Sequence, residues 1–331
     1  GDSNMKKIFF ALFFATPVFA AKSYKSAIYY QPKAHQHSLL VDYVYGGGSV
    51  DVTLNRAAYG TIDYSAQSLN GSYLYGLNDF FAFGISDSYG TGLVKLKVNS
   101  TGRTTELKSS GLSDVNLIAK GFVDTGMMVI RYGGDVAFAL ETSKSSGTNF
   151  EGNRSSGGSQ VTPYIVGELG FDNNNLRLAL GLNYRYYTDR KSENSTGVQS
   201  TTTGGNKVEL SPSVEMDFGP ATLFGQYIYT STDSSKVTDA TTTTSSNGST
   251  THTFGAGAYY DFNPNFTMRG TVIYATSTYP ATATLDSYDQ NILIFSVGGI
   301  INFGGEKKKP LAGPRPKKAP ASVDDEPQAE Q

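Results

Sequence analysis

The amino-acid sequence predicts an all-β fold: a transmembrane, antiparallel, up-and-down β-barrel of about 12 strands, followed by a disordered tail. Apolar and polar residues alternate along runs of about 10 to 14 residues, which is the period of a β-strand. Short turns and longer polar loops alternate between these runs, and aromatic residues gather near the ends of the runs. No run of 18 apolar residues is present, which excludes a protein built on transmembrane helices.

The composition excludes several kinds of chemistry. The 331-residue chain contains no cysteine, which rules out disulfides, thiolate zinc sites and cysteine nucleophiles, and its three histidines argue against a histidine-based metal site or triad. A net charge of -2 creates no field that attracts polyphosphates, so nucleic acid is not an expected partner. No cofactor and no metal are expected.

The N-terminus has the features of a secretory signal peptide over residues 5–20. Lys6 and Lys7 form its basic region, residues 8–14 (IFFALFF) form its apolar core, and Ala20 ends its cleavage signal. The alternative is an amphipathic or core helix, but the apolar core is too short to span a bilayer, which needs about 20 residues. We therefore expect an exported protein in which residues 21–35 form a short periplasmic leader.

The barrel is expected to occupy residues 36–303. Its strands are expected at approximately 36–45, 61–75, 80–89, 112–123, 127–142, 160–171, 176–188, 206–218, 221–231, 251–262, 266–277 and 289–303. The stretches 46–60 and 92–98 could extend a strand or add a hairpin, so a count of about 10 to 14 remains open.

The connections between these strands are of two kinds. Short Gly, Asn, Asp and Pro signals for tight reversals lie at 76–79, 124–126, 172–175, 219–220 and 263–265. Longer polar stretches rich in Ser, Thr, Asn and Gly lie at 90–111, 144–159, 189–205, 232–250 and 278–288. Short periplasmic turns and long extracellular loops are typical of barrels in the outer membrane of Gram-negative bacteria.

Aromatic residues are expected to form two belts where the barrel meets the lipid headgroups. The members of these belts are Tyr184, Tyr186, Tyr227, Tyr229, Tyr260, Phe262 and Phe303. An interfacial ring lies among headgroups while its polar group reaches water, whereas the core of a soluble sandwich would place aromatics in the middle of its strands.

Residues 36–303 resemble a Gram-negative outer-membrane β-barrel in this pattern. Residues 291–303 resemble the terminal-strand assembly signal of such proteins, which ends in an aromatic residue, although here the chain continues after Phe303. Residues 111–120 (GLSDVNLIAK) are similar to a strand that is common in the family named for the MetA pathway of phenol degradation. This resemblance implies transport of small molecules.

The polar residues that alternate with the apolar ones are expected to line the lumen, because Arg or Lys at the lipid-facing midplane would cost about 2–4 kcal/mol. The expected lining is Asp114, Lys120, Arg131, Asp135, Glu141, Glu168, Arg177, Arg185, Glu209, Glu215, Asp217 and Arg269. These charges could select ions and orient solutes, or they could pair across a narrow bore and fill it.

The favoured function is a channel for passive uptake of small solutes through a narrow polar lumen, with outer-membrane lipid and the solutes as partners. The alternative is an occluded barrel whose Ser/Thr-rich extracellular loops bind partners. An enzyme is not expected, because His252 has no serine and orienting amide at an evident strand spacing, and because Glu215 and Asp217 share a face that suits pore lining.

The Pro- and Lys-rich residues 304–331 are expected to form a disordered periplasmic tail, because such a composition cannot bury a core. The basic half of the tail could contact the cell wall or a periplasmic protein, or the tail could be a solvated spacer.

Overall fold

The computed structural model describes residues 28–305 except 55–56, 100, 145–150, 172–174, 195 and 282–287. The predicted signal peptide and nearly all of the predicted tail lie outside the described residues. In the described part of the chain, no helix is long and apolar enough to cross a bilayer.

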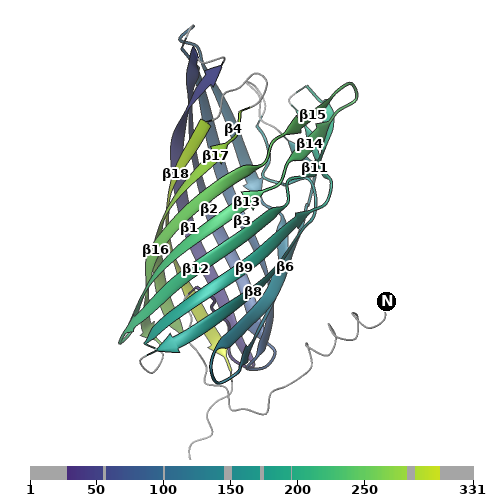
Figure 1. Ribbon diagram of the computed structural model, residues 1–331. Coiled ribbons are helices and arrows are strands. Elements are labelled where there is room, and N and C mark those ends of the chain that lie inside the picture. The colour runs from purple at the N-terminus through teal and green to yellow at the C-terminus, as the bar shows by residue number, and fades with distance from the viewer. Residues whose placement is uncertain are drawn as a thin grey trace, which may run out of the picture.

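The chain forms a closed antiparallel barrel with 12 strand positions in its wall, which confirms the predicted fold class (Figure 1). The wall strands are β1 (Gln36–Leu54), β2 (Ala57–Gly76), β3 (Phe81–Val98), β4 (Thr104–Leu112), β5 (Val115–Asp124), β6 (Val129–Phe138), β8 (Gln160–Phe171), β9 (Leu176–Tyr187), β12 (Lys207–Phe218), β13 (Ala221–Thr232), β16 (Ser249–Asn263), β17 (Phe266–Tyr279) and β18 (Tyr288–Gly304). The ring closes where β1 pairs with β18, from Gln36 opposite Gly304 to Gly47 opposite Leu293.

One wall position is shared by two strands. The first part of β3 pairs with β5, and its later part, from Tyr89 to Lys97, pairs with β4. The predicted strand 112–123 is therefore wrong at its start, because the extended pairing stops at Ser113 and Asp114. The alternative left open for 92–98 is confirmed, because β3 continues through this stretch to Val98 and pairs with β4 as a hairpin, so most of the expected loop 90–111 is strand.

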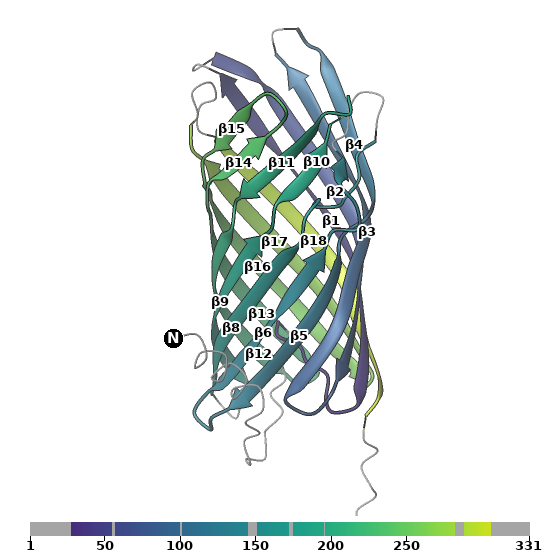
Figure 2. The ribbon, with the colours of Figure 1, turned by 90° about the vertical axis from the view of Figure 1, so that its right-hand side faces the viewer.

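The two ends of the barrel differ. At one end, short turns such as Gly219–Pro220 join neighbouring strands, and we call this the turn end. At the other end, the loop end, the polar connections form a second sheet of β7 (Ser143–Lys144), β10 (Arg190–Glu193), β11 (Gln199–Gly204), β14 (Ser235–Thr238) and β15 (Thr243–Ser246). Figures 1 and 2 show the hairpins of this sheet rising above the rim on one side.

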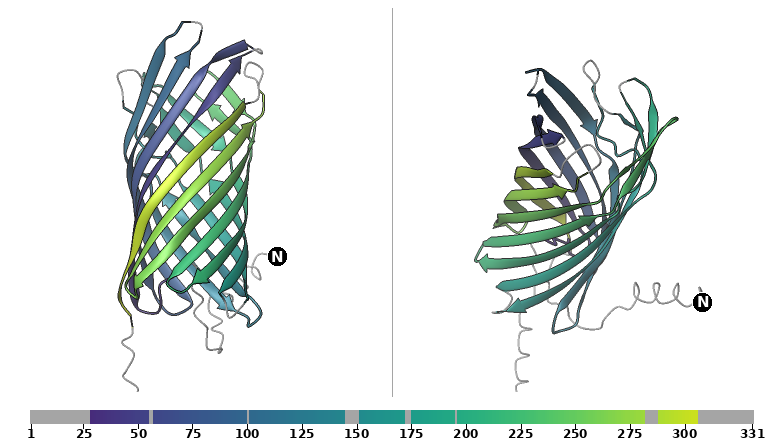
Figure 3. Two further views of the ribbon diagram at one scale, coloured as in Figure 1. Left: turned by 90° about the vertical axis from the view of Figure 1, so that its left-hand side faces the viewer. Right: turned by 45° about the horizontal axis from the view of Figure 1, so that its top comes forward.

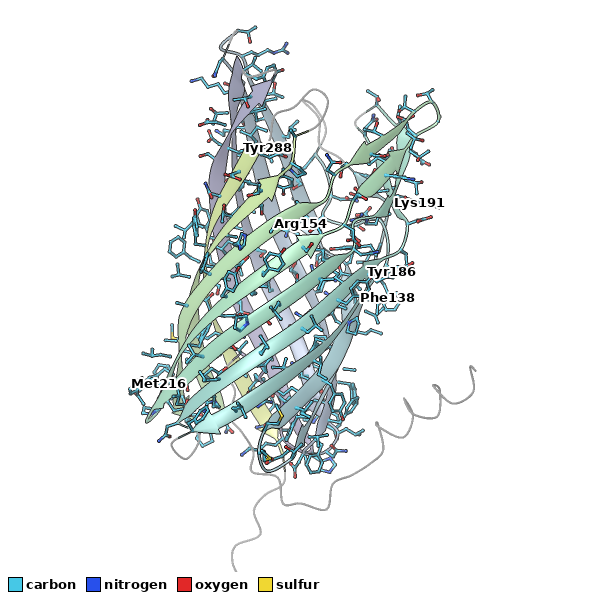
Figure 4. All side chains as sticks on the ribbon, viewed as in Figure 1. Phe138, Arg154, Tyr186, Lys191, Met216 and Tyr288 are labelled. Carbon is cyan, nitrogen blue, oxygen red and sulfur yellow. The ribbon has the colours of Figure 1, made fainter. Side chains whose placement is uncertain are left out.

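The wall strands run obliquely around the barrel, and the right panel of Figure 3 shows its loop end turned toward the viewer. Along β9 the side chains alternate strictly: Leu178, Leu180 and Leu182 are exposed on the outside, whereas Arg177 is buried inside. Figure 4 shows Met216, on β12, and Tyr186, on β9, projecting from the outer surface. The outer face is therefore apolar, and the polar residues of the same strands face the lumen.

The outer face gives a direct test of membrane embedding. Leu180 lies near the middle of β9 and is 54% exposed on the outside. Replacing Leu180 with Arg is expected to destabilise the barrel in lipid vesicles by about 2–4 kcal/mol, because a cation at the lipid midplane loses its hydration. The measurement is urea unfolding in vesicles, and the control is Gln226→Arg, whose side chain faces the lumen. Equal losses for the two variants would contradict a lipid-facing outer wall.

Candidate functional site: the barrel lumen

A buried ion pair joins β6 and β8 on the lumen face. The Nε and Nη2 atoms of Arg131 donate to the two carboxylate oxygens of Glu168 at 3.1 and 3.2 Å. The two side chains are only 5% and 2% exposed, so the pair is fully removed from water. The opposite charges compensate each other here. Transferring an isolated charge from water to such a buried position would cost roughly several kcal/mol of desolvation free energy.

A second cluster, with two carboxylates, joins β9 and β12. Arg177 donates to Glu215 at 2.9 Å and to Asp217 at 2.6 Å. Alternation on β12 brings both acids to the same face, two residues apart, and the planar guanidinium can bond both at once. Because their oxygens are engaged by Arg177, the two acids form a structural cluster rather than a free acid–base pair.

Two further pairs lie on the lumen face. Arg185 lies 3.6 Å from Glu209 near the loop end of β9 and β12. Arg269, on β17, pairs with Asp42, on β1, across the intervening strand β18. The ion pairs of the described lumen thus join strands that are adjacent or one strand apart in the wall, rather than opposite walls of the bore.

The remaining predicted lining residues have different positions. Asp135 faces the lumen near Arg185 and Glu209, and Lys120 donates from β5 to the carbonyl oxygen of Tyr30 at 3.0 Å. Asp114 lies at the break between β4 and β5 and accepts hydrogen bonds from the Ser155 hydroxyl and the Ser156 amide.

The prediction for Glu141 is wrong. β6 ends at Phe138, because its pairing with β8 stops at Ala137 opposite Gln160. Glu141 therefore lies in the connection that follows and is exposed, although the alternating pattern continues through it. The hydrophobic pattern alone could not show where the partner strand ends.

Part of the stretch 21–35, which was expected to form a periplasmic leader, instead crosses the lumen near the turn end. Residues 28–33 precede β1, and we call them the lumen segment. The amide of Ile28 donates to Glu215 at 2.8 Å, on one side of the barrel. The hydroxyl of Tyr30 bonds Ser38 at 2.7 Å and Asn302 at 2.6 Å, on the seam between β1 and β18. The lumen segment is therefore held from opposite walls.

The barrel wall is shaped to receive this segment. A side chain at Gly181 would come within 3.2 Å of the Tyr29 hydroxyl and within 2.5 Å of the Ser211 hydroxyl. Glycine at this position therefore leaves the room that the Tyr29 ring occupies. No periodic pattern marks residues 28–33, so their place inside the barrel could be found only from the structure.

The described residues of the barrel enclose, among other spaces, a lower and an upper cavity. The lower cavity, of about 180 Å³, lies between Ile28 and the wall formed by β13, β16 and β17. Its lining contains Phe224, Ile228 and Tyr259 and no charged residue. The upper cavity, of about 420 Å³, lies toward the loop end between β1, β2, β3, β4 and β18 and contains Arg154. The sequence did not single out any of these residues as a lining.

The seven predicted belt aromatics all lie on the outer face. Tyr184, Tyr186, Tyr260, Phe262 and Phe303 are between 42% and 57% exposed. Tyr227 and Tyr229 are half-buried there beside His252 and Phe254. This placement is what an interfacial role requires.

The outer-face residue His252 pairs with an aromatic neighbour. Its Nδ1 lies 2.7 Å from the Tyr227 hydroxyl, and Tyr229 lies opposite it in the ladder. Among the described residues, no group of three His, Asp or Glu side chains is placed to hold a metal ion.

The closed ring, the apolar outer face and the polar inner face define a membrane-spanning β-barrel of the Gram-negative outer-membrane class. No protein-family model and no curated protein matches the chain.

The chain is similar to several solved structures, with one of which it shares the fold at a TM-score above 0.5. The COG4313 outer-membrane channel from Pseudomonas putida F1 is 11% identical, with 84% of this chain and 99% of that chain covered and a TM-score of 0.58. The transport unit of the autotransporter AIDA-I from Escherichia coli is 11% identical over 84% of this chain and 94% of that chain, with a TM-score of 0.48. The CymD monoaromatic hydrocarbon channel is 9% identical over 83% and 90%, with a TM-score of 0.42. At these identities the likeness concerns the fold alone.

Proposed function

We propose that the protein is an outer-membrane channel for passive uptake of small solutes through a narrow polar lumen. The observation that carries this proposal is the division of each wall strand into an apolar outer face and an inner face of paired charges, with cavities left between the walls. A bore of 12 strands lies between the filled interior of about eight strands and the open channel of about 16. The Pseudomonas putida F1 protein with the same fold is an outer-membrane channel, which supports the proposal.

In this proposal the turn end faces the periplasm and the loop end faces the exterior, as in other barrels of this class. Four inward arginines, Arg131, Arg177, Arg185 and Arg269, are held against carboxylates, so much of the inward charge is compensated. The channel would therefore select small solutes by their size and polarity, and it would discriminate only weakly between cations and anions.

One observation favours the second candidate, an occluded barrel whose Ser/Thr-rich loops bind partners. The lumen segment is anchored on opposite walls and reduces the free cross-section near the turn end. The five-stranded sheet of β7, β10, β11, β14 and β15 would then provide the surface for partners.

Planar-bilayer recording separates the two candidates. The purified full chain is expected to give stepwise, ohmic conductance, because the lumen segment leaves a cavity of about 180 Å³ between itself and the wall. Its folded state is verified first by the mobility of unheated protein in gel electrophoresis. Folded protein that inserts at high load and gives no conductance steps would contradict the channel and support the occluded barrel.

A further inference from the structure

The upper cavity combines an apolar wall with a single cation. Its lining includes Val44, Val94, Leu107, Ile292 and Ile294, and the only charged member is Arg154. Except for Arg154, these side chains come from the lumen face of the tall part of the wall, where β3 and β4 extend toward the loop end. A solute that enters from the loop end meets this cavity before it reaches the lumen segment.

Arg154 is held over the cavity by the connection between β6 and β8. Gly152 exchanges backbone hydrogen bonds with β4, donating to Lys108 at 2.9 Å and accepting from Ser110 at 3.0 Å. On the other side of Arg154, Ser155 donates to the buried Asp114 at 2.7 Å. These bonds fix the backbone on both sides of Arg154. Figure 4 shows Arg154 behind the front strands, within the barrel, and Lys191 at the outer margin.

The wall makes room for the guanidinium. A Cβ atom at Gly90 would lie only 1.9 Å from Nη1 of Arg154, so the absence of a side chain at this position lets the arginine lie against β3. The same Nη1 has a long contact of 3.5 Å with the carbonyl oxygen of Gln67. Gly90 therefore leaves the space in which the Arg154 guanidinium lies, and a larger residue at this position would occupy that space.

The charge of Arg154 differs from that of the other lumen arginines. Arg131, Arg177, Arg185 and Arg269 each lie against a carboxylate. Within the described ranges, no carboxylate lies within ion-pair distance of Arg154. Its guanidinium retains donors that can bind an anion through two parallel hydrogen bonds, as arginine binds carboxylates and phosphates. The apolar lining of the cavity favours the less strongly hydrated, singly charged carboxylate.

We propose that the upper cavity is a binding site for a small monocarboxylate with an apolar body. The carboxylate binds the guanidinium of Arg154, and the apolar body packs against Val94, Leu107 and Ile294. This inference rests on the proposed function, because it specifies one class of solute that the channel would take up. A neutral molecule of the same shape lacks the ionic contact, and acetate lacks the apolar contact.

The test is isothermal titration calorimetry of the full-length barrel in lipid nanodiscs, with hexanoate, acetate and 1-hexanol as probes and empty nanodiscs as the blank. Hexanoate is expected to bind more tightly than either of the other probes. Arg154→Ala is expected to weaken hexanoate binding about 10-fold or more, because it removes a charge-assisted hydrogen bond. Gly90→Ala is expected to weaken binding in the same direction, since the added methyl group displaces the guanidinium.

The matched control is Lys191→Ala, which removes a cation at the loop end but outside the cavity, and should leave hexanoate binding unchanged. Arg154→Lys keeps the charge and loses the planar fork, so it should bind hexanoate with intermediate strength. Equal binding of hexanoate and 1-hexanol, or wild-type binding by Arg154→Ala, would overturn the proposed site. Conductance without hexanoate binding would refute this site alone, and hexanoate binding without conductance would refute the channel alone.

Discussion

Replacing Glu168 with Ala is expected to destabilise the folded barrel by about 3–5 kcal/mol. The reason is that Arg131 would remain charged at a position where its side chain is only 5% exposed and would lose both of its hydrogen bonds to the carboxylate. The measurement is the free energy of unfolding in urea, followed by tyrosine fluorescence in lipid vesicles. Fluorescence is suited to this chain because it contains 22 tyrosines and no tryptophan.

The matched control for this variant is Glu106→Ala. Glu106 pairs with Lys95 at 2.9 Å on the hairpin of β3 and β4, but both side chains are 45% exposed. An exposed pair contributes little to stability, so this variant should unfold close to the wild-type urea concentration. The double variant Arg131→Met with Glu168→Leu removes both charges and should recover much of the lost stability. A similar small loss for Glu168→Ala and Glu106→Ala would show that Arg131 is solvated.

Deleting residues 28–32 is expected to raise the single-channel conductance roughly twofold or more, because the bore of a 12-stranded barrel would lose its internal obstruction. The deletion removes the contacts of this segment with Glu215, Lys120 and Asn302. The measurement is the distribution of conductance steps in planar bilayers under the same salt and voltage.

A deletion of residues 240–242, in the turn between β14 and β15, is the control, because it shortens the chain at the loop end without touching the lumen segment. It should leave the step size unchanged. Heat-dependent mobility in gel electrophoresis shows whether each deletion variant is folded. Folded protein with wild-type steps after deletion of residues 28–32 would mean that the segment does not limit the passage.

The strands were predictable where one face meets lipid and the other meets a polar lumen. Strict alternation located β9, expected at 176–188 and observed at Leu176–Tyr187, and β12, expected at 206–218 and observed at Lys207–Phe218. The same alternation continues through Glu141, where no partner strand is present. The two-residue alternation therefore predicts where a strand lies and which of its faces is apolar. Where the strand ends depends on how far the neighbouring strand pairs with it.

The contents of the lumen were less accessible from the sequence. The alternation along each strand predicts that Arg177 and Glu215 face inward. It does not predict the register of β9 against β12, which places the two residues opposite each other. Residues 28–33 and Arg154 lie outside the barrel strands, so no periodicity indicates where their side chains point. Their positions depend on contacts with residues that are distant in the sequence, such as Tyr30 with Asn302.

The bonds of Tyr30 have a consequence for how the molecule matures. Its hydroxyl bonds Ser38, near the start of the first strand, and Asn302, which lies near the end of the last strand and 272 positions after Tyr30. This binding pocket exists only after the final strand has joined the first, and contacts of such large sequence separation form late because their loops are costly to close. Tyr30 can therefore make both of its bonds only once β1 has paired with β18, so docking of the lumen segment depends on closure of the barrel.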